Sequence, residues 1–115
     1  MGKTVEVLNI KGDMPTVEEA RRRLLDAIKS ARARGVPVLK VIHGYGASGV
    51  GGQLRPALRK SLARRRKEGV ISEFIFGEAW SAFDERTRIC LEQHPSLRND
   101  PDLDRSNEGM TIVVM

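Results

Sequence analysis

The sequence contains one cysteine, few aromatic side chains and no long apolar run, and each shortage excludes a class of protein. Cys90 has no second cysteine with which to form an intramolecular disulfide, and no cysteine or histidine cluster around it has metal-ligand spacing. No stretch approaches the roughly 20 apolar residues that a membrane-spanning helix needs, and residues 1–4 lack the apolar stretch of a secretory signal. We therefore expect a soluble, cytoplasmic protein with no membrane partner, in which Cys90 is a buried core thiol.

The length predicts one domain. A chain of 115 residues with 40% apolar side chains can bury one continuous core, and a second full domain would not fit. We expect a single domain over residues 1–115. Aromatic residues make up only 4% of the chain, so Trp80 and Phe83 are expected in the core rather than on an exposed platform.

Basic and acidic residues are unevenly distributed along the chain. Residues 1–69 contain 16 Lys and Arg against 6 Asp and Glu, whereas residues 70–115 contain 4 against 9. Basic side chains that neutralise phosphates release condensed counterions, so the basic region favours a polyanionic partner. The alternative is that this charge serves solubility alone.

Hydrophobic periodicity predicts the element order β-α-β-α-β-(α)-β. A capping-box pattern at Thr16 and Glu19 predicts the start of the first helix, and Gly35 predicts its end. Crossover helices place the first strands parallel, so we predict a two-layer α/β sandwich with a mostly parallel four-stranded sheet. Residues 94–108 are rich in Pro, Asn, Asp and Ser and predict a mobile, acidic surface-loop insertion. The expected strands are 4–10, 36–42, 70–76 and 109–115, and the expected helices run from 16 to 34, from 53 to 68 and from about 81 to 93.

A glycine-rich stretch lies between the second strand and the second helix. Residues 43–52 include five glycines, and the first turn of the following helix presents unpaired N–H groups that suit a phosphate. Residues 44–49 match the glycine spacing of a dinucleotide fingerprint, but a dinucleotide site needs a longer sheet and an acidic residue after the next strand. No nucleotide cofactor is expected.

The motifs on and around this stretch resemble those of the Smr (small MutS-related) domain family. The sequence Ile42-His43-Gly44-Tyr45-Gly46, followed by Leu54-Arg55, resembles the His-Gly-x-Gly signature and its continuation. Residues 8–12 stand where the family has Leu-Asp-x-His-Gly, and residues 109–113 resemble its last strand. The resemblance implies a fold like the C-terminal domain of a bacterial translation initiation factor, with DNA or RNA as partner. Many members of the family have endonuclease or nicking activity, so the resemblance also implies this activity as a possible function.

The first motif departs from the family at its chemical residues. Asn9 and Lys11 replace the Asp and His associated with cleavage. An amide cannot act as a carboxylate base, and a charged lysine is a poor proton acceptor, although it suits a phosphate contact. Enzymatic activity is therefore left open, no catalytic residue is assigned, and no cofactor is expected apart from Mg²⁺ or Mn²⁺ if the protein is a nuclease.

These observations predict one phosphate-binding surface. His43 either contacts the ligand or braces its turn through a neighbouring carbonyl. One alternative is a structure-selective nuclease that uses His43, Asp13 or Glu78, and another is a protein-interaction module that uses the acidic loop or the surroundings of Trp80. The predicted nucleic-acid-binding residues are Lys11, His43, Gly44, Tyr45, Gly46, Arg55 and Arg59.

Overall fold

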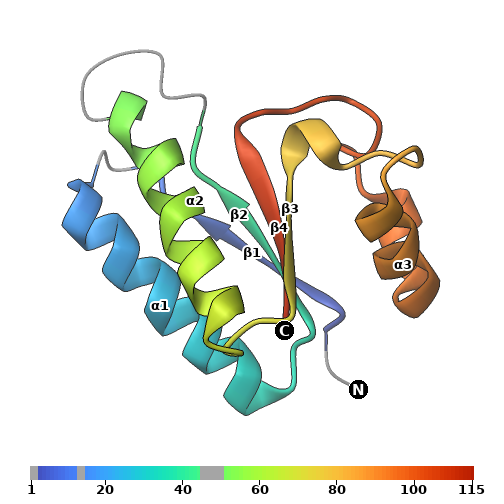
Figure 1. Cartoon of the computed structure of the whole chain (residues 1–115), viewed down its shortest axis with the longest axis horizontal. Coiled ribbons are helices and arrows are strands. Elements are labelled where there is room, and N and C mark those ends of the chain that lie inside the picture. Colours follow the sequence, from blue (N-terminus) through green and yellow to red (C-terminus); the bar gives the residue numbers. More distant parts are fainter. Residues whose placement is uncertain (1–2, 13–14, 45–50) are drawn as a thin grey trace.

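The computed structural model describes residues 3–12, 15–44 and 51–115. No helix in these ranges is long and apolar enough to cross a membrane. The expected alternation of strands and helices is present, with two additional 3-10 helices (Figure 1). The elements are β1 (Val5–Asn9), α1 (Val17–Arg34), β2 (Val38–Ile42), α2 (Gly51–Lys67), β3 (Glu73–Phe76), η1 (Gly77–Ala79), α3 (Glu85–Gln93), η2 (Pro95–Asn99) and β4 (Met110–Val114).

Helix α1 begins and ends where its local sequence predicts. The Thr16 hydroxyl accepts a hydrogen bond from the Glu19 backbone N–H at 3.1 Å, which satisfies one free donor of the first turn. Gly35 ends the helix in the left-handed conformation, with φ 72°. One face of α1 is buried, and its buried residues are Ala20, Leu24, Ile28 and Ala31.

The sheet is mixed, and the prediction of a mostly parallel sheet is wrong. The strand order is β1-β2-β4-β3, in which β1 and β2 are parallel and β4 is antiparallel to both of its neighbours. The first three strands do share one direction, as the crossover helices require. The last strand lies between β2 and β3, where neighbours on both sides pair its backbone donors and acceptors. Strand periodicity contains no information about this order.

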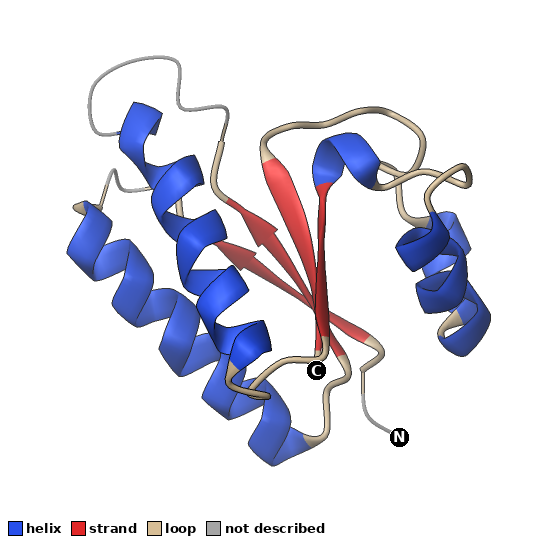
Figure 2. Cartoon of the chain, viewed as in Figure 1, coloured by secondary structure: helices blue, strands red, loops and turns tan. Residues whose placement is uncertain are grey.

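Both faces of the sheet are covered, so the fold has three layers rather than the predicted two. Helices α1 and α2 cover one face, and α3 and η2 lie over the other (Figure 2). Alternate residues of β2 belong to two hydrophobic cores, one on each face of the sheet. Leu39 packs in the first core, beneath α1 and α2, and Val38 packs in the second core, beneath α3 and η2. Trp80 is fully buried in the second core, as is Cys90, whose pKa burial raises to about 11.

Residues 94–108, predicted as a surface loop, are largely exposed, but they include the short helix η2 and are attached to the sheet through a few side chains. Leu97 of η2 is buried, and Asp100 and Asp102 pair with Lys40 of the central strand β2, at 3.0 and 2.6 Å from its Nζ. Burial opposes the charged form of Lys40, but its hydrogen bonds to Asp102 and Asp100 outweigh burial and raise its pKa. The acidic residues are placed here because a buried ammonium requires close counter-charges.

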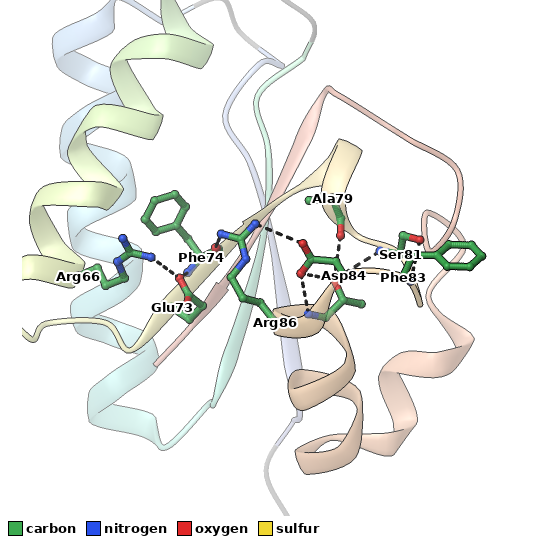
Figure 3. Close-up of polar contacts among 9 residues, drawn as sticks. Arg66, Glu73, Phe74, Ala79, Ser81, Phe83, Asp84 and Arg86 are labelled. Atoms are coloured by element: carbon green, nitrogen blue, oxygen red, sulfur yellow. Dashed lines mark hydrogen bonds and ion pairs between the residues drawn. The ribbon is translucent and has the colours of Figure 1, made fainter.

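The exposed edge of β3 is capped by side chains (Figure 3). The Phe74 N–H donates to Glu73 Oε1 at 3.0 Å, and Arg86 Nη1 donates to the Phe74 carbonyl at 3.4 Å. Arg66 holds the Glu73 carboxylate from α2 at 2.7 Å. A covered edge of this kind is a poor template for pairing with another strand.

Phe83 is 93% exposed, so the prediction that it belongs to the core is wrong. The spacing of Trp80 and Phe83 suits a helix that starts near residue 81, but α3 begins after Asp84, whose carboxylate accepts from the Thr87 N–H at 3.0 Å. Phe83 therefore lies in the preceding turn, where helical spacing does not apply, and its ring points away from the sheet (Figure 3).

Candidate nucleic-acid interface

The turns that follow β1 and β2 lie side by side at one edge of the sheet. The Ile10 N–H donates to the Ile42 carbonyl at 2.9 Å, which continues the parallel pairing beyond the strands. Gly44 has a φ of 77°, and a Cβ added there would lie 3.3 Å from Cδ of Lys11. Glycine suits this position for two reasons: it adopts the left-handed backbone conformation without strain, and its lack of a Cβ leaves room for the aliphatic part of the Lys11 side chain.

Asn9 organises the first turn. Its Oδ1 accepts the Lys11 backbone N–H at 3.1 Å, an arrangement that closes a tight turn at the end of β1. Lys11 is exposed and has no ion-pair partner in the part of the chain that the structure describes. The ammonium is consequently available to an anion from solvent.

His43 braces the second turn from inside the protein. Its side chain is 2% exposed, and Nδ1 lies 2.9 Å from the Gly44 carbonyl, which can only accept, so Nδ1 carries the hydrogen. Nε2 then accepts from the Thr111 hydroxyl of β4 at 3.0 Å. Burial lowers the pKa of His43, and the charges of Arg59 and Arg55 lower it further. A neutral, doubly hydrogen-bonded imidazole has no free nitrogen for a ligand or a proton.

Arg59 and Arg55 extend from α2 toward the same edge, and each faces a glutamate. Arg59 Nη2 lies 2.6 Å from Glu78 Oε1, and the guanidinium carbon lies 3.7 Å from the centre of the Phe76 ring. Burial opposes the charged form of Glu78, but its hydrogen bond to Arg59 and further hydrogen-bond and charge interactions outweigh burial and lower its pKa. Arg55 Nη1 lies 3.9 Å from Glu108 Oε1, a longer contact between more exposed side chains.

The two glutamates were not part of the predicted surface. The nuclease alternative uses Glu78 as a catalytic carboxylate, and nothing in the local pattern around Glu108 indicates a partner 53 positions earlier in the chain. The predicted residues Tyr45 and Gly46 lie outside the described residues. Among the residues that are described, no group of three or more His, Cys, Asp or Glu could hold a metal ion.

A family model of the Smr domain matches residues 8–79, more than half of the chain, including both turns and α2. The chain belongs to the Smr domain family. This family is generally associated with nucleic-acid binding and nuclease-like activity. The matched region ends at η1, so α3, η2 and β4 lie beyond it.

A search of solved structures supports the fold over nearly the whole chain. The structure is similar to the crystal structure of the Smr domain of Thermus thermophilus MutS2, with a TM-score of 0.55 and 23% sequence identity. The similarity covers 96% of this chain and 95% of that one, so this Smr domain shares its architecture beyond residue 79. A search of curated proteins found no significant match.

Proposed function

We propose that this Smr domain binds the phosphate backbone of nucleic acid at the sheet edge formed by the turns after β1 and β2. The observation that carries the proposal is the contact between Lys11 and Gly44, two positions far apart in the sequence. The contact brings an ammonium, which has no ion-pair partner in the described parts of the chain, to the turn that leads into α2. Membership of the Smr family supports the same class of ligand.

Each cation has a distinct part in this proposal. Lys11 supplies an exposed point charge, and the N–H groups at the start of α2 add the positive end of the helix dipole. Arg59 lies over the Phe76 ring and carries a planar fork suited to phosphate oxygens, for which the phosphate competes with Glu78. Tyr45 and Gly46 directly follow Gly44 in sequence, and their participation remains a prediction.

His43 positions the site without contacting the ligand. Its hydrogen bonds to Gly44 and Thr111 tie the second turn to the central strand β4. Replacing His43 should therefore displace the turn rather than delete a ligand contact. The same contacts argue against His43 as the acid or base of the nuclease alternative.

Salt-dependent binding tests the proposal. Fluorescence anisotropy with branched DNA, single-stranded DNA and a structured RNA should show binding at low salt that weakens steeply as salt rises. Lys11→Glu and Arg55→Glu should each weaken binding at least tenfold, whereas Lys29→Glu, the same charge change at an exposed position on α1, should have a much smaller effect. Equal effects at all three positions, or no binding by the wild type, would refute the assignment.

The nuclease alternative is tested on the same preparations. A plasmid-nicking assay with Mg²⁺ or Mn²⁺ should be run on the wild type, on Glu78→Gln and on Glu92→Gln, a matched change on α3. If the wild type and Glu92→Gln nick the plasmid and Glu78→Gln does not, hydrolysis rather than binding alone would be the function of this sheet edge.

A further inference from the structure

A groove of about 350 Å³ lies between α1 and α2, and its lining is basic. The two helices lie next to each other on one face of the sheet (Figure 1). The groove lies on the α1 side of α2, whereas Arg59 contacts Phe76 and Glu78 on the β3 side. Its lining residues are Arg21, Lys60, Ser61, Arg64 and Arg65.

Positive charge in this groove is poorly compensated. Glu68 lies within ion-pair distance of Arg64 and Arg65, at 3.4 and 2.8 Å. Arg21 and Lys60 have no ion-pair partner in the described ranges of the chain. Lys60 and Arg64 are also four residues apart on one helix, a spacing at which like charges repel.

The lining also has unused hydrogen-bonding capacity. Arg65 Nε is buried without a hydrogen-bond partner among the described residues, and Ser61 contributes a half-buried hydroxyl. Guanidinium groups and hydroxyls are common donors to phosphate oxygens. An anion in the groove would relieve the repulsion and accept hydrogen bonds from Ser61 and from Arg64, whose side chain is 74% exposed.

The position of the groove indicates an extended ligand. From Gly51, at the end of α2 that the proposed function assigns to the binding edge, to Arg65 is 14 residues of helix, or about 21 Å at the rise of an α-helix. This length corresponds to about six steps of a nucleic-acid strand at 3.4 Å per step. A continuous phosphodiester backbone can span both places, whereas a small anion would occupy only one.

We propose that the groove between α1 and α2 is a second phosphate-binding site, which holds a part of the nucleic acid that extends beyond the sheet edge. This inference rests on the proposed function. Arg21 and Lys60 contact phosphates across the groove from opposite helices, and Arg64 and Arg65 extend the contact along α2. An acidic peptide is the other macromolecule that would suit such a groove.

The test compares two double variants with the same change in charge. Arg21→Gln/Lys60→Gln removes one cation from each wall of the groove, and Arg22→Gln/Lys29→Gln removes two exposed cations of α1 outside it. Both variants should fold, as judged by circular dichroism and thermal melting. Affinity for a 20-base-pair duplex is then measured by anisotropy over a range of salt concentrations.

If each groove residue holds one phosphate, the slope of log K against log salt should decrease in magnitude by about 1.8 in the groove variant. At 0.1 M salt the same loss corresponds to about 60-fold weaker binding. The control pair should change affinity less than about threefold. Equal changes in the two double variants would overturn the second site, and would leave the sheet-edge proposal intact if Lys11→Glu still weakens binding at least tenfold.

Two further outcomes separate this inference from the proposed function. A wild type that binds no nucleic acid overturns both proposals together. A fluorescent ten-residue polyglutamate that binds more tightly than the duplex, and loses binding in Arg21→Gln/Lys60→Gln, would assign the groove to an acidic protein partner.

Discussion

Replacing Glu78 with glutamine should strengthen nucleic-acid binding, because the carboxylate competes with phosphate for Arg59. The two side chains are 2.6 Å apart, and 18% of Arg59 and 33% of Glu78 remain exposed. Glutamine keeps a carbonyl oxygen that can still accept a hydrogen bond from Arg59. The guanidinium should also keep its place over Phe76, so the substitution removes mainly the negative charge.

Two contributions set the expected size of the effect. Releasing Arg59 from a partly exposed ion pair is worth about 0.2–1 kcal/mol. A phosphate on the far side of the guanidinium would be roughly 6 Å from the carboxylate, where repulsion in water costs about 0.7 kcal/mol. Together these terms predict about 5- to 18-fold tighter binding at low salt, and a smaller gain near physiological salt because of screening.

The assay is an anisotropy titration of the wild type, Glu78→Gln and Glu92→Gln with one duplex at two salt concentrations. Glu92 is exposed on α3 and undergoes the same chemical change. A Glu78 variant that binds no more tightly than the Glu92 variant would show that overall charge, not competition for Arg59, is responsible. Weaker binding would show that Glu78 orients Arg59 for the ligand, and the reasoning would be refuted.

Three further predictions concern stability, measured as the free energy of unfolding in urea. Lys40→Ala should lower it by about 3–5 kcal/mol, because the carboxylates of Asp100 and Asp102, which are 8% and 26% exposed, lose their counter-charge. The exposed Lys29→Ala should cost less than about 0.5 kcal/mol, and similar losses in both variants would contradict the pairing of Lys40 with these carboxylates. His43→Asn should cost about 2–4 kcal/mol. The folded state lowers the pKa of His43, so below about pH 6.5 the unfolded chain binds more protons than the folded one. The free energy of unfolding of the wild type should therefore fall as the pH decreases through this range. The His43→Asn variant should lose the part of this pH dependence that His43 contributes. Phe83→Ser should change stability by less than about 0.5 kcal/mol and Trp80→Ala by about 3–5 kcal/mol, and a costly Phe83→Ser would contradict the exposed position of its ring.

Local patterns in the sequence were sufficient for much of the helical structure and for part of the site. The start of α1 at Thr16 and its end at Gly35 follow from hydrogen bonds and backbone conformations within a few residues, so composition and spacing predict them. The nearly continuous apolar run of β2 likewise indicates a strand covered on both faces. The two glycine turns could be placed at one sheet edge because crossover connections align the ends of parallel strands.

Contacts between distant residues could not be predicted in the same way. The position of β4 between β2 and β3 depends on which strand pairing satisfies the most backbone N–H and C=O groups. The alternation of apolar residues along β4 would be the same at the edge of the sheet as in its centre, so it cannot predict this position. An acidic, Asp-rich segment reads as a solvated loop until Lys40 is known to be buried against it. Phe83 shows the converse error, since a shift of a few residues in the start of α3 moves an apparent core residue into solvent.

The amino-acid sequence alone determined the class of fold, the family motifs and the concentration of basic residues, because these depend on composition and on spacing along the chain. Only the tertiary structure decided what each charged or titratable side chain faces. It turned His43 inward, set Glu78 against Arg59 and placed Lys11 beside Gly44, where it has no ion-pair partner among the residues that the structure describes. The physical reason is that charge effects depend on separation and burial in three dimensions, and neither quantity is encoded locally.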